Sequence, residues 1–277
     1  MNQQSKQASK VSHGNISREP QAITTDQQSL VVQQFGSTAE NYLSSTVHAQ
    51  GQDLQRLAAL AARLQPAHSL DLGCGAGHAS FALASATSGA VTAYDLSGQM
   101  LQVVAAEAQR RDLRNLHTRQ GLVENLPFGD ASFDLVATRF SAHHWLDMER
   151  AAAEMVRVLK PGGTLVVIDV VAPEVPLFDT VLQTLELLRD SSHVRNYRVS
   201  EWKSMLVNAG LSFVGSDSWK LPLDFDSWVK RIRTSAARIA ALQVSMQELP
   251  QEVKEYFAVQ PDLSFSSDTA WIEARHH

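Results

Sequence analysis

A glycine-rich turn between a short strand and a helix is the sequence feature that most constrains this fold. The strand predicted over 69–72 (SLDL) runs directly into the turn 73–77 (GCGAG). Glycines in such a turn allow positive φ angles and let a ligand approach the backbone, because no Cβ stands in the way. The helix that follows then presents its N-terminal amides to the ligand. The turn therefore predicts a binding site at the carboxyl end of a strand.

An acidic residue at the end of the next predicted strand, 90–95, limits the class of ligand that the site can bind. Asp95 can accept hydrogen bonds from both vicinal hydroxyls of a ribose. The turn and the acid together predict a cofactor that contains adenosine. The alternative interpretation is an ordinary tight turn followed by a surface aspartate, because glycine motifs of this kind are weak when taken alone.

Two side chains beside the turn bear on which adenosine cofactor is bound. A dinucleotide fold prefers a third glycine where this chain has His78. Asp71 brings a carboxylate into the site, which is unfavourable beside a pyrophosphate and favourable beside the ammonium and sulfonium groups of S-adenosylmethionine. The residues therefore favour S-adenosylmethionine, and an NAD-dependent oxidoreductase is the second reading.

The turn lies within an alternating pattern of strands and helices, which is typical of a parallel sheet with right-handed crossovers. Strands are predicted at 69–72, 90–95, 115–120, 132–138 and 164–171. A helix at 54–64 precedes the first strand, and helices at 98–111 and 147–159 lie between later ones. The last third is less regular. There the sequence predicts helices at 177–188, 201–209 and 226–247, and strands at 211–214 and 269–274, the latter as an edge strand.

Composition limits the class of protein. With 44% apolar residues in 277, the chain can bury a large core, and the net charge of −5 argues against a nucleic-acid partner. The single cysteine, Cys74, excludes an intrachain disulfide and a cysteine zinc cluster, and no metal site is predicted. We expect a flexible polar tail over 1–28, no integral membrane segment and a cytoplasmic location.

Several short motifs occur in an order that resembles a known family, the class I S-adenosylmethionine-dependent methyltransferases. The sequence is similar to the branch that contains the quinone-biosynthesis C-methyltransferases. The resemblance spans about 33–277 and is strongest over 69–171. Its elements are 71–77 (DLGCGAG), 94–97 (YDLS), 124–128 (ENLPF), 133–136 (FDLV), 143–145 (HHW) and 159–163 (LKPGG).

The resemblance implies a Rossmann-like α/β fold with a mostly parallel seven-stranded sheet, helices on both faces and a last antiparallel strand. It implies one domain over 29–277 with substrate insertions near 172–200 and 220–262. It also implies that S-adenosylmethionine is bound and S-adenosylhomocysteine released. The implied cofactor residues are Tyr42, Asp71, Gly73, Cys74, Gly75, Asp95, Leu96, Met100, Leu122, Val123, Arg139 and Phe140. Leu122 departs from the family, since many relatives have an acid there that bonds the adenine amino group.

Methyl transfer often needs a base that deprotonates the acceptor. Four residues near the predicted site are candidates for the catalytic site, as a base or as a contact to the acceptor. His144 follows the fourth strand, and Asp169 interrupts the apolar strand 164–171. His193 and Arg195 lie in the predicted insertion, as base and anchor of an anionic acceptor. For each, a structural role is the alternative. The basic helix predicted over 226–247 is either a solvated face or a peripheral contact with anionic lipid.

The sequence thus predicts an S-adenosylmethionine-dependent methyltransferase that acts on a small molecule of unknown identity. The alternatives are the oxidoreductase and a non-catalytic protein that binds S-adenosylmethionine. The type of methylated atom and the oligomeric state are not determined by the residues.

Overall fold

A mixed sheet of seven strands organises the structure, a computed structural model that describes residues 26–36 and 51–277. The strand order is β3-β2-β1-β4-β5-β7-β6, and β7 alone runs antiparallel to its neighbours β5 and β6. This confirms the predicted fold class. The strands are β1 (His68–Leu72), β2 (Ala90–Asp95), β3 (Leu116–Gln120), β4 (Phe133–Arg139), β5 (Leu159–Val170), β6 (Leu211–Leu223) and β7 (Phe265–His276).

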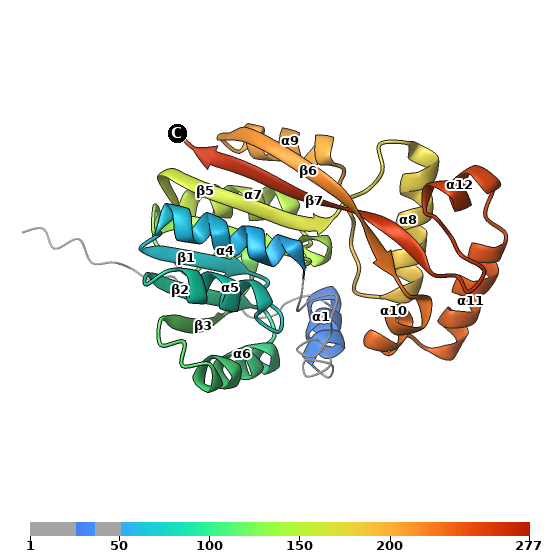
Figure 1. Ribbon diagram of the computed structural model, residues 1–277, viewed down its shortest axis with the longest axis horizontal. Coiled ribbons are helices and arrows are strands. Elements are labelled where there is room, and N and C mark those ends of the chain that lie inside the picture. The colour runs from blue at the N-terminus through green and yellow to red at the C-terminus, as the bar shows by residue number, and fades with distance from the viewer. Residues whose placement is uncertain (1–25, 37–50) are drawn as a thin grey trace, which may run out of the picture.

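Helices cover both faces of the sheet (Figure 1). One face is covered by α4 (Gln52–Leu64), α5 (His78–Ala86) and α6 (Gly98–Arg110), the other by α7 (Met148–Val158) and α9 (Val199–Asn208). In α4, Leu54, Leu57 and Leu60 recur at helical spacing and are all buried against the sheet. The segment 165–168 of β5 is fully buried because helices cover both of its faces.

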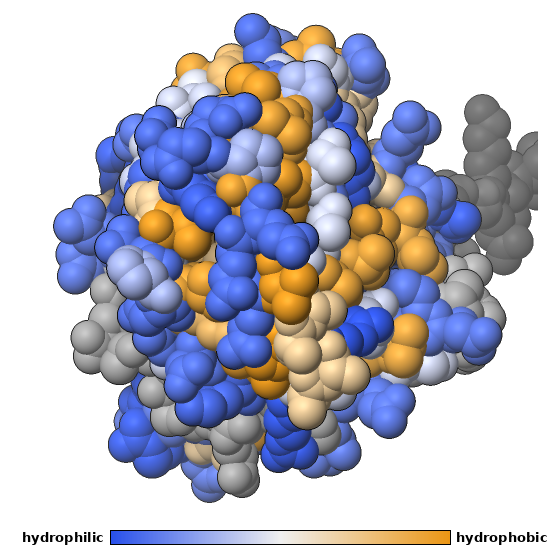
Figure 2. Space-filling view, turned by 90° about the vertical axis from the view of Figure 1, so that its right-hand side faces the viewer, coloured by the Kyte–Doolittle hydropathy of each residue, from blue (hydrophilic) through white to orange (hydrophobic). Residues whose placement is uncertain are grey.

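A lobe of four further helices lies at one end of the sheet, where β6 and β7 extend beyond the other strands (Figure 1). It consists of α8 (Pro176–Arg189), α10 (Phe225–Arg231), α11 (Ala236–Gln247) and α12 (Gln251–Tyr256). Trp228, Leu242 and Phe265 are buried in its separate apolar core. Figure 2 views this lobe from outside and shows apolar side chains emerging between hydrophilic ones; Leu187 and Val244 are among its exposed apolar residues.

The single basic helix predicted over 226–247 is wrong. The chain leaves α10 through Arg233, which has a φ of 56°, and α11 starts at Ala236. The basic side chains of this segment make contacts within the lobe. Lys230 pairs with Asp226 at 3.0 Å, and Arg238 donates to the carbonyl of Leu187 at 3.0 Å. Helical periodicity could not reveal this break, because both halves carry the same spacing of apolar residues.

The C-terminal strands and the N-terminal segment also differ from the prediction. The strand predicted over 211–214 is the start of the much longer β6, and β7 lies inside the sheet instead of at its edge. β6 and β7 pair across some forty intervening residues, a contact that local pattern does not encode. Helix α1 (Asp26–Gly36) begins within the last residues of the predicted tail. In the described residues, no helix is both long and apolar enough to cross a membrane.

Candidate functional site

The carboxyl ends of β1, β2 and β4 surround a cavity of about 1050 Å³ that opens to solvent, here called the first cavity. Parallel strands place their following turns at this edge, so residues far apart in sequence meet there. Of the predicted cofactor residues, those that line it are Asp71, Gly73, Cys74, Gly75, Asp95, Leu96, Met100, Leu122, Val123, Arg139 and Phe140. Tyr42, the remaining one, lies outside the described residues.

The glycine turn forms the floor of the first cavity. Gly73, Gly75 and Gly77 have φ angles of 64°, 50° and 87°. The amide of Gly73 donates to the carbonyl of Tyr94 at 2.8 Å, which fixes the turn to the end of β2. A Cβ on Gly73 would lie 1.7 Å from the Ser141 hydroxyl oxygen, whereas a Cβ on Gly75 would meet no atom within 4 Å. The turn is therefore packed tightly on one side and open toward the cavity on the other.

Asp95 ends β2 and holds two backbone amides at the cavity wall. Its carboxylate accepts from the amide of Gly75 at 2.8 Å and from the amide of Ser97 at 2.8 Å. Burial raises the pKa of Asp95 above its ordinary value, and these two hydrogen bonds oppose that shift. Each carboxylate oxygen can accept a further bond, so the group can still receive ribose hydroxyls.

Asp71 is the most buried carboxylate of the first cavity. One of its oxygens accepts from the Ser80 hydroxyl at 2.5 Å, and the other, also buried, has no hydrogen-bond partner among the described residues. Burial raises the pKa of Asp71 to about 6. A buried carboxylate with an unused oxygen is costly unless a cation or a donor pairs with it. This side chain is therefore suited to a positively charged ligand.

An apolar strip beside the acidic groups is formed by Leu96, Met100, Leu122 and Val123. Leu122, where many relatives have an acid, uses its own carbonyl to accept from the Tyr94 hydroxyl at 3.0 Å. Glu124 also lines the cavity, and its carboxylate accepts from the amide of Leu146 at 3.1 Å.

Helix α1 forms a wall of the first cavity that the predicted residues did not include. Gln28, Val31 and Phe35 line the cavity. Gln27 lines it too, and its side-chain amide donates to the carbonyl of His144 at 3.1 Å and to that of Ser192 at 2.8 Å. The polar composition before residue 30 concealed this helix, since few apolar positions mark its buried face.

Arg139 is the last residue of β4, and Phe140 follows it. Both side chains line the first cavity. Arg139 forms a buried ion pair with Asp53 of α4, which fixes the strand end against that helix. Phe140 has a φ of 51°, an uncommon value for a residue with a side chain. Such backbone strain is typical of functional sites.

A second cavity of about 600 Å³ adjoins the first. Phe35, Phe140 and His144 line both cavities, so the two share a wall. The rest of the second cavity comes from the lobe and from the ends of β4, β5 and β6. It is lined there by His143, Val170, Glu186, Arg189, Asn196, Leu221, Leu223, Trp228 and Arg231.

Asp169 supports His143, which was not among the predicted catalytic residues. The His143 Nδ1 lies 2.7 Å from the Asp169 carboxylate, which also accepts from the amide of Ala142 at 3.0 Å. Burial lowers the pKa of His143, but the charge of Asp169 and its hydrogen bond outweigh burial, so the pKa is raised. A histidine pair after the fourth strand and an acid in the fifth are both visible in the sequence, but their pairing depends on the adjacency of β4 and β5.

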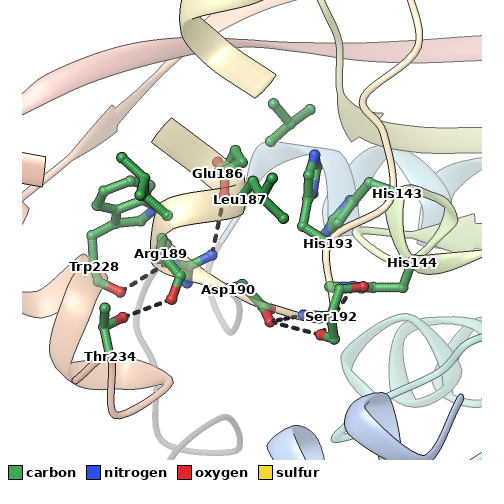
Figure 3. Close-up of polar contacts among 12 residues, drawn as sticks. His143, His144, Glu186, Leu187, Arg189, Asp190, Ser192, His193, Trp228 and Thr234 are labelled. Atoms are coloured by element: carbon green, nitrogen blue, oxygen red, sulfur yellow. Dashed lines mark hydrogen bonds and ion pairs between the residues drawn. The ribbon is translucent and has the colours of Figure 1, made fainter. Parts of the chain in front are cut away.

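His144 and His193 lie near His143 (Figure 3), and both are poor bases. Burial lowers the pKa of His193 to about 2, and its Nε2 lies 3.1 Å from the side-chain oxygen of Gln183. Burial and the neighbouring His143 lower the pKa of His144 to about 4. His193 lines neither cavity, so its predicted role as base is not supported. The described residues contain no group of three acidic, histidine or cysteine side chains that could hold a metal ion.

Arg195, predicted as an anchor for the acceptor, also lines neither cavity. Its guanidinium lies 3.1 Å from Glu201 and 3.5 Å from Asp179. These pairs fasten the loop after α8 to the first turn of α8 and to the start of α9. The role of Arg195 as an anchor for the acceptor stays a prediction, and its contacts in the structure are with these two helices.

Comparisons with known proteins agree with this architecture. The "Methyltransferase domain" family matches residues 70–167. The Escherichia coli protein YafE is 50% identical over 67% of this chain and 89% of its own length. YcgJ of Bacillus subtilis, described as an uncharacterized methyltransferase, is 35% identical over 81% of this chain and 88% of its own length. The crystal structure of YcgJ has a TM-score of 0.75, with 80% of this chain and 99% of that chain covered at 31% identity.

A sheet of this order with a glycine turn after the first strand defines a Rossmann-like methyltransferase fold. The extent of the match to YafE and YcgJ then places the chain within a family. It belongs to the class I S-adenosylmethionine-dependent methyltransferases.

Proposed function

We propose that the first cavity binds S-adenosylmethionine and that the methyl group passes to a small molecule seated in the second cavity. The observation that carries this proposal is the buried Asp71 carboxylate, which has an oxygen without a partner in the described structure. The ammonium group of the cofactor is the complementary charge. No phosphate needs to lie beside this acid, because S-adenosylmethionine has none.

The remaining wall fits the other parts of the cofactor. Asp95 would accept from the ribose hydroxyls, and Leu96, Met100 and Val123 would flank the adenine. Gly75, on which a Cβ would point into open space, leaves room for the ligand against the backbone. Cys74 packs in this turn as a neutral thiol, since burial raises its pKa well above the ordinary value. When bound, the cofactor supplies an electrophilic methyl group on a sulfonium.

A small acceptor is favoured by the lining of the second cavity. Apolar side chains such as Trp228 and Leu223 stand there beside a few polar ones, as in sites for small molecules. The net charge of −5 also argues against a nucleic acid as the acceptor. A cytoplasmic location completes this proposal, because the one cysteine is buried as a free thiol.

Calorimetry with S-adenosylhomocysteine tests the cofactor assignment. Asp95→Ala should weaken binding by about 100-fold or more, because two hydrogen bonds to a charged group are lost. Asp112→Asn removes an exposed acid whose partner is Arg114 and should leave the affinity unchanged. Binding of NADH in place of S-adenosylhomocysteine, or equal affinities for wild type and Asp95→Ala, would refute the assignment.

A further inference from the structure

The second cavity combines apolar walls with an unusual set of charges. Phe140, Trp228 and Leu223 provide apolar surface, and Arg189 and Arg231 bring two guanidinium groups. Among the described residues, Glu186 is the one carboxylate that lines it, and it is paired with Arg189 at 3.4 Å. Figure 3 shows Glu186, Arg189 and Trp228 on one side and the imidazole of His143 on the other. The described lining therefore has little negative charge to pair with an ammonium ion, whereas its guanidinium groups would stabilise an oxygen that becomes negative.

His143 presents one ring nitrogen for chemistry. Nδ1 is engaged with Asp169 at 2.7 Å, so this nitrogen carries the proton that the carboxylate accepts. Among the described residues, Nε2 has no hydrogen-bond partner, and the imidazole is 17% exposed in the wall of the second cavity. A carboxylate behind an imidazole fixes its tautomer and stabilises the cation that forms when Nε2 takes a proton.

Asp169 is itself held firmly, which makes this arrangement rigid. It is buried at the end of β5 and accepts from the backbone amides of Ala142 and Val170 at 3.0 and 2.8 Å. The carbonyl of His143 accepts in turn from the amides of Val194 and Arg195. Both partners are therefore anchored by backbone hydrogen bonds from separate segments, as a positioned base requires.

We propose that His143 is the general base of the methyl transfer and that the acceptor in the second cavity is a hydroxyl compound, neutral before the reaction. This inference rests on the proposed function. Asp169 is a positioning residue, since it acts through His143. The acceptor hydroxyl gives its proton to Nε2 of His143, and its oxygen forms a new bond to the methyl carbon. The electron pair of the broken carbon–sulfur bond stays on sulfur, so charge and atoms balance.

Asn196 adds a donor suited to such an acceptor. It lines the second cavity and is 1% exposed, and its side-chain nitrogen has no hydrogen-bond partner among the described residues. A buried amide nitrogen without a partner is costly. An oxygen on the bound acceptor would supply the missing partner, whereas an ammonium group, which only donates, would not.

Transfer of tritium from labelled S-adenosylmethionine into a small-molecule extract of Escherichia coli tests the base. His143→Gln should lower product formation by about 10²- to 10⁴-fold, the usual contribution of a general base. Its affinity for S-adenosylhomocysteine should remain within twofold of wild type. His117→Gln, at an exposed position of β3, is the matched control and should not change the rate. Leu221→Trp, which fills the second cavity from β6, should also abolish transfer with cofactor affinity kept.

The pH dependence distinguishes a base from a merely structural histidine. Transfer should fall as the pH drops through the pKa of His143, and Asp169→Asn should move this midpoint to lower pH. NMR titration of ¹⁵N-histidine in the S-adenosylhomocysteine complex should show the same shift without turnover. The charged and titratable groups that face His143 are Asp169, Glu186, Arg189, Asp190, His144, His193 and Arg231.

The outcomes separate this proposal from the proposed function. If the wild-type protein binds no S-adenosylhomocysteine, the cofactor assignment is wrong. If it binds S-adenosylhomocysteine but labels no small molecule, the proposed acceptor class is wrong. In both cases the proposed role of His143 is wrong as well. If transfer proceeds and His143→Gln retains more than a third of it, His143 is not the base. Mass spectrometry that finds the label on an amine nitrogen would overturn the hydroxyl acceptor alone.

Discussion

The two cavities differ in how the chain builds them. The first is formed by consecutive strand ends: Asp71, Gly73 and Asp95 lie within 25 residues and meet because β1 and β2 are neighbours. The second draws on α1, the segment after β4, β5, α8 and the loop after it, β6 and α10. Phe35 and Arg231 therefore face one space although nearly two hundred residues separate them. A site made of neighbouring turns depends on local motifs, whereas a site made of remote segments depends on the packing of the lobe.

Their electrostatic characters are also opposite. The first cavity contains the carboxylates of Asp71 and Asp95 on either side of the glycine turn. The part of the second cavity that the structure describes contains the guanidinium groups of Arg189 and Arg231 and the carboxylate of Glu186, which is paired with Arg189. This difference in charge would favour a cationic cofactor in the first cavity and an acceptor that loses a proton in the second. Substitutions in the first cavity should therefore act on cofactor affinity, and those around the second on turnover.

The largest expected effect comes from crowding the glycine turn. Gly73→Ala places a Cβ 1.7 Å from the Ser141 hydroxyl at a φ of 64°. We expect a loss of stability of about 2 kcal/mol or more from overpacking and backbone strain together, and no measurable binding of S-adenosylhomocysteine. Thermal unfolding and calorimetry measure the two effects.

Gly75→Ala is the matched control for this prediction. It has the same positive φ but open space around the new Cβ, so its folding cost should be about 1 kcal/mol. Its affinity for S-adenosylhomocysteine should still fall, because the methyl group points into the first cavity. Equal stability losses for the two variants would show that crowding by Ser141 does not matter.

A smaller effect, opposite in sign for stability and binding, is expected at Asp71. Its pKa rises from 3.8 unfolded to about 6 folded, so the folded state binds the proton more tightly. Stability of the ligand-free protein should therefore decrease as the pH rises from about 4 to 6 and stay lower above that window. Asp71→Asn lacks this titration and should be more stable at pH 8, by at most about 3 kcal/mol.

The same Asp71→Asn variant should bind S-adenosylhomocysteine more weakly, because the ammonium group loses its counter-charge. Urea unfolding at pH 4 and pH 8, with calorimetry at pH 8, separates the two effects. Ser80→Ala provides the comparison, since it removes the hydrogen bond at 2.5 Å but keeps the carboxylate. If Asp71→Asn is no more stable than wild type at pH 8, the charge of the buried Asp71 carboxylate must already be stabilised in the ligand-free protein.

The contrast between the cavities also explains what the sequence could predict. The parallel core and the first cavity follow from alternating strands and helices and from a turn whose glycines require special backbone angles. The break between α10 and α11, the internal place of β7 and the pairing of His143 with Asp169 depend on contacts between distant segments. Arg195 and His193 attracted attention because they cluster in sequence, but the loop turns them toward Glu201 and Gln183 and away from both cavities.

The smallest effect is expected at Arg195, where the lobe meets the sheet. Its guanidinium is 36% exposed, and Asp179 keeps a second partner, Arg198, at 2.9 Å. Arg195→Ala should therefore cost less than about 1 kcal/mol, as exposed ion pairs do, and should leave cofactor affinity and label transfer unchanged. Arg198→Ala removes the shorter contact to the same carboxylate and should destabilise more. If Arg195→Ala instead lowered transfer tenfold at full cofactor affinity, the acceptor would extend beyond the second cavity to this loop. The acceptor site would then include the segment between α8 and α9.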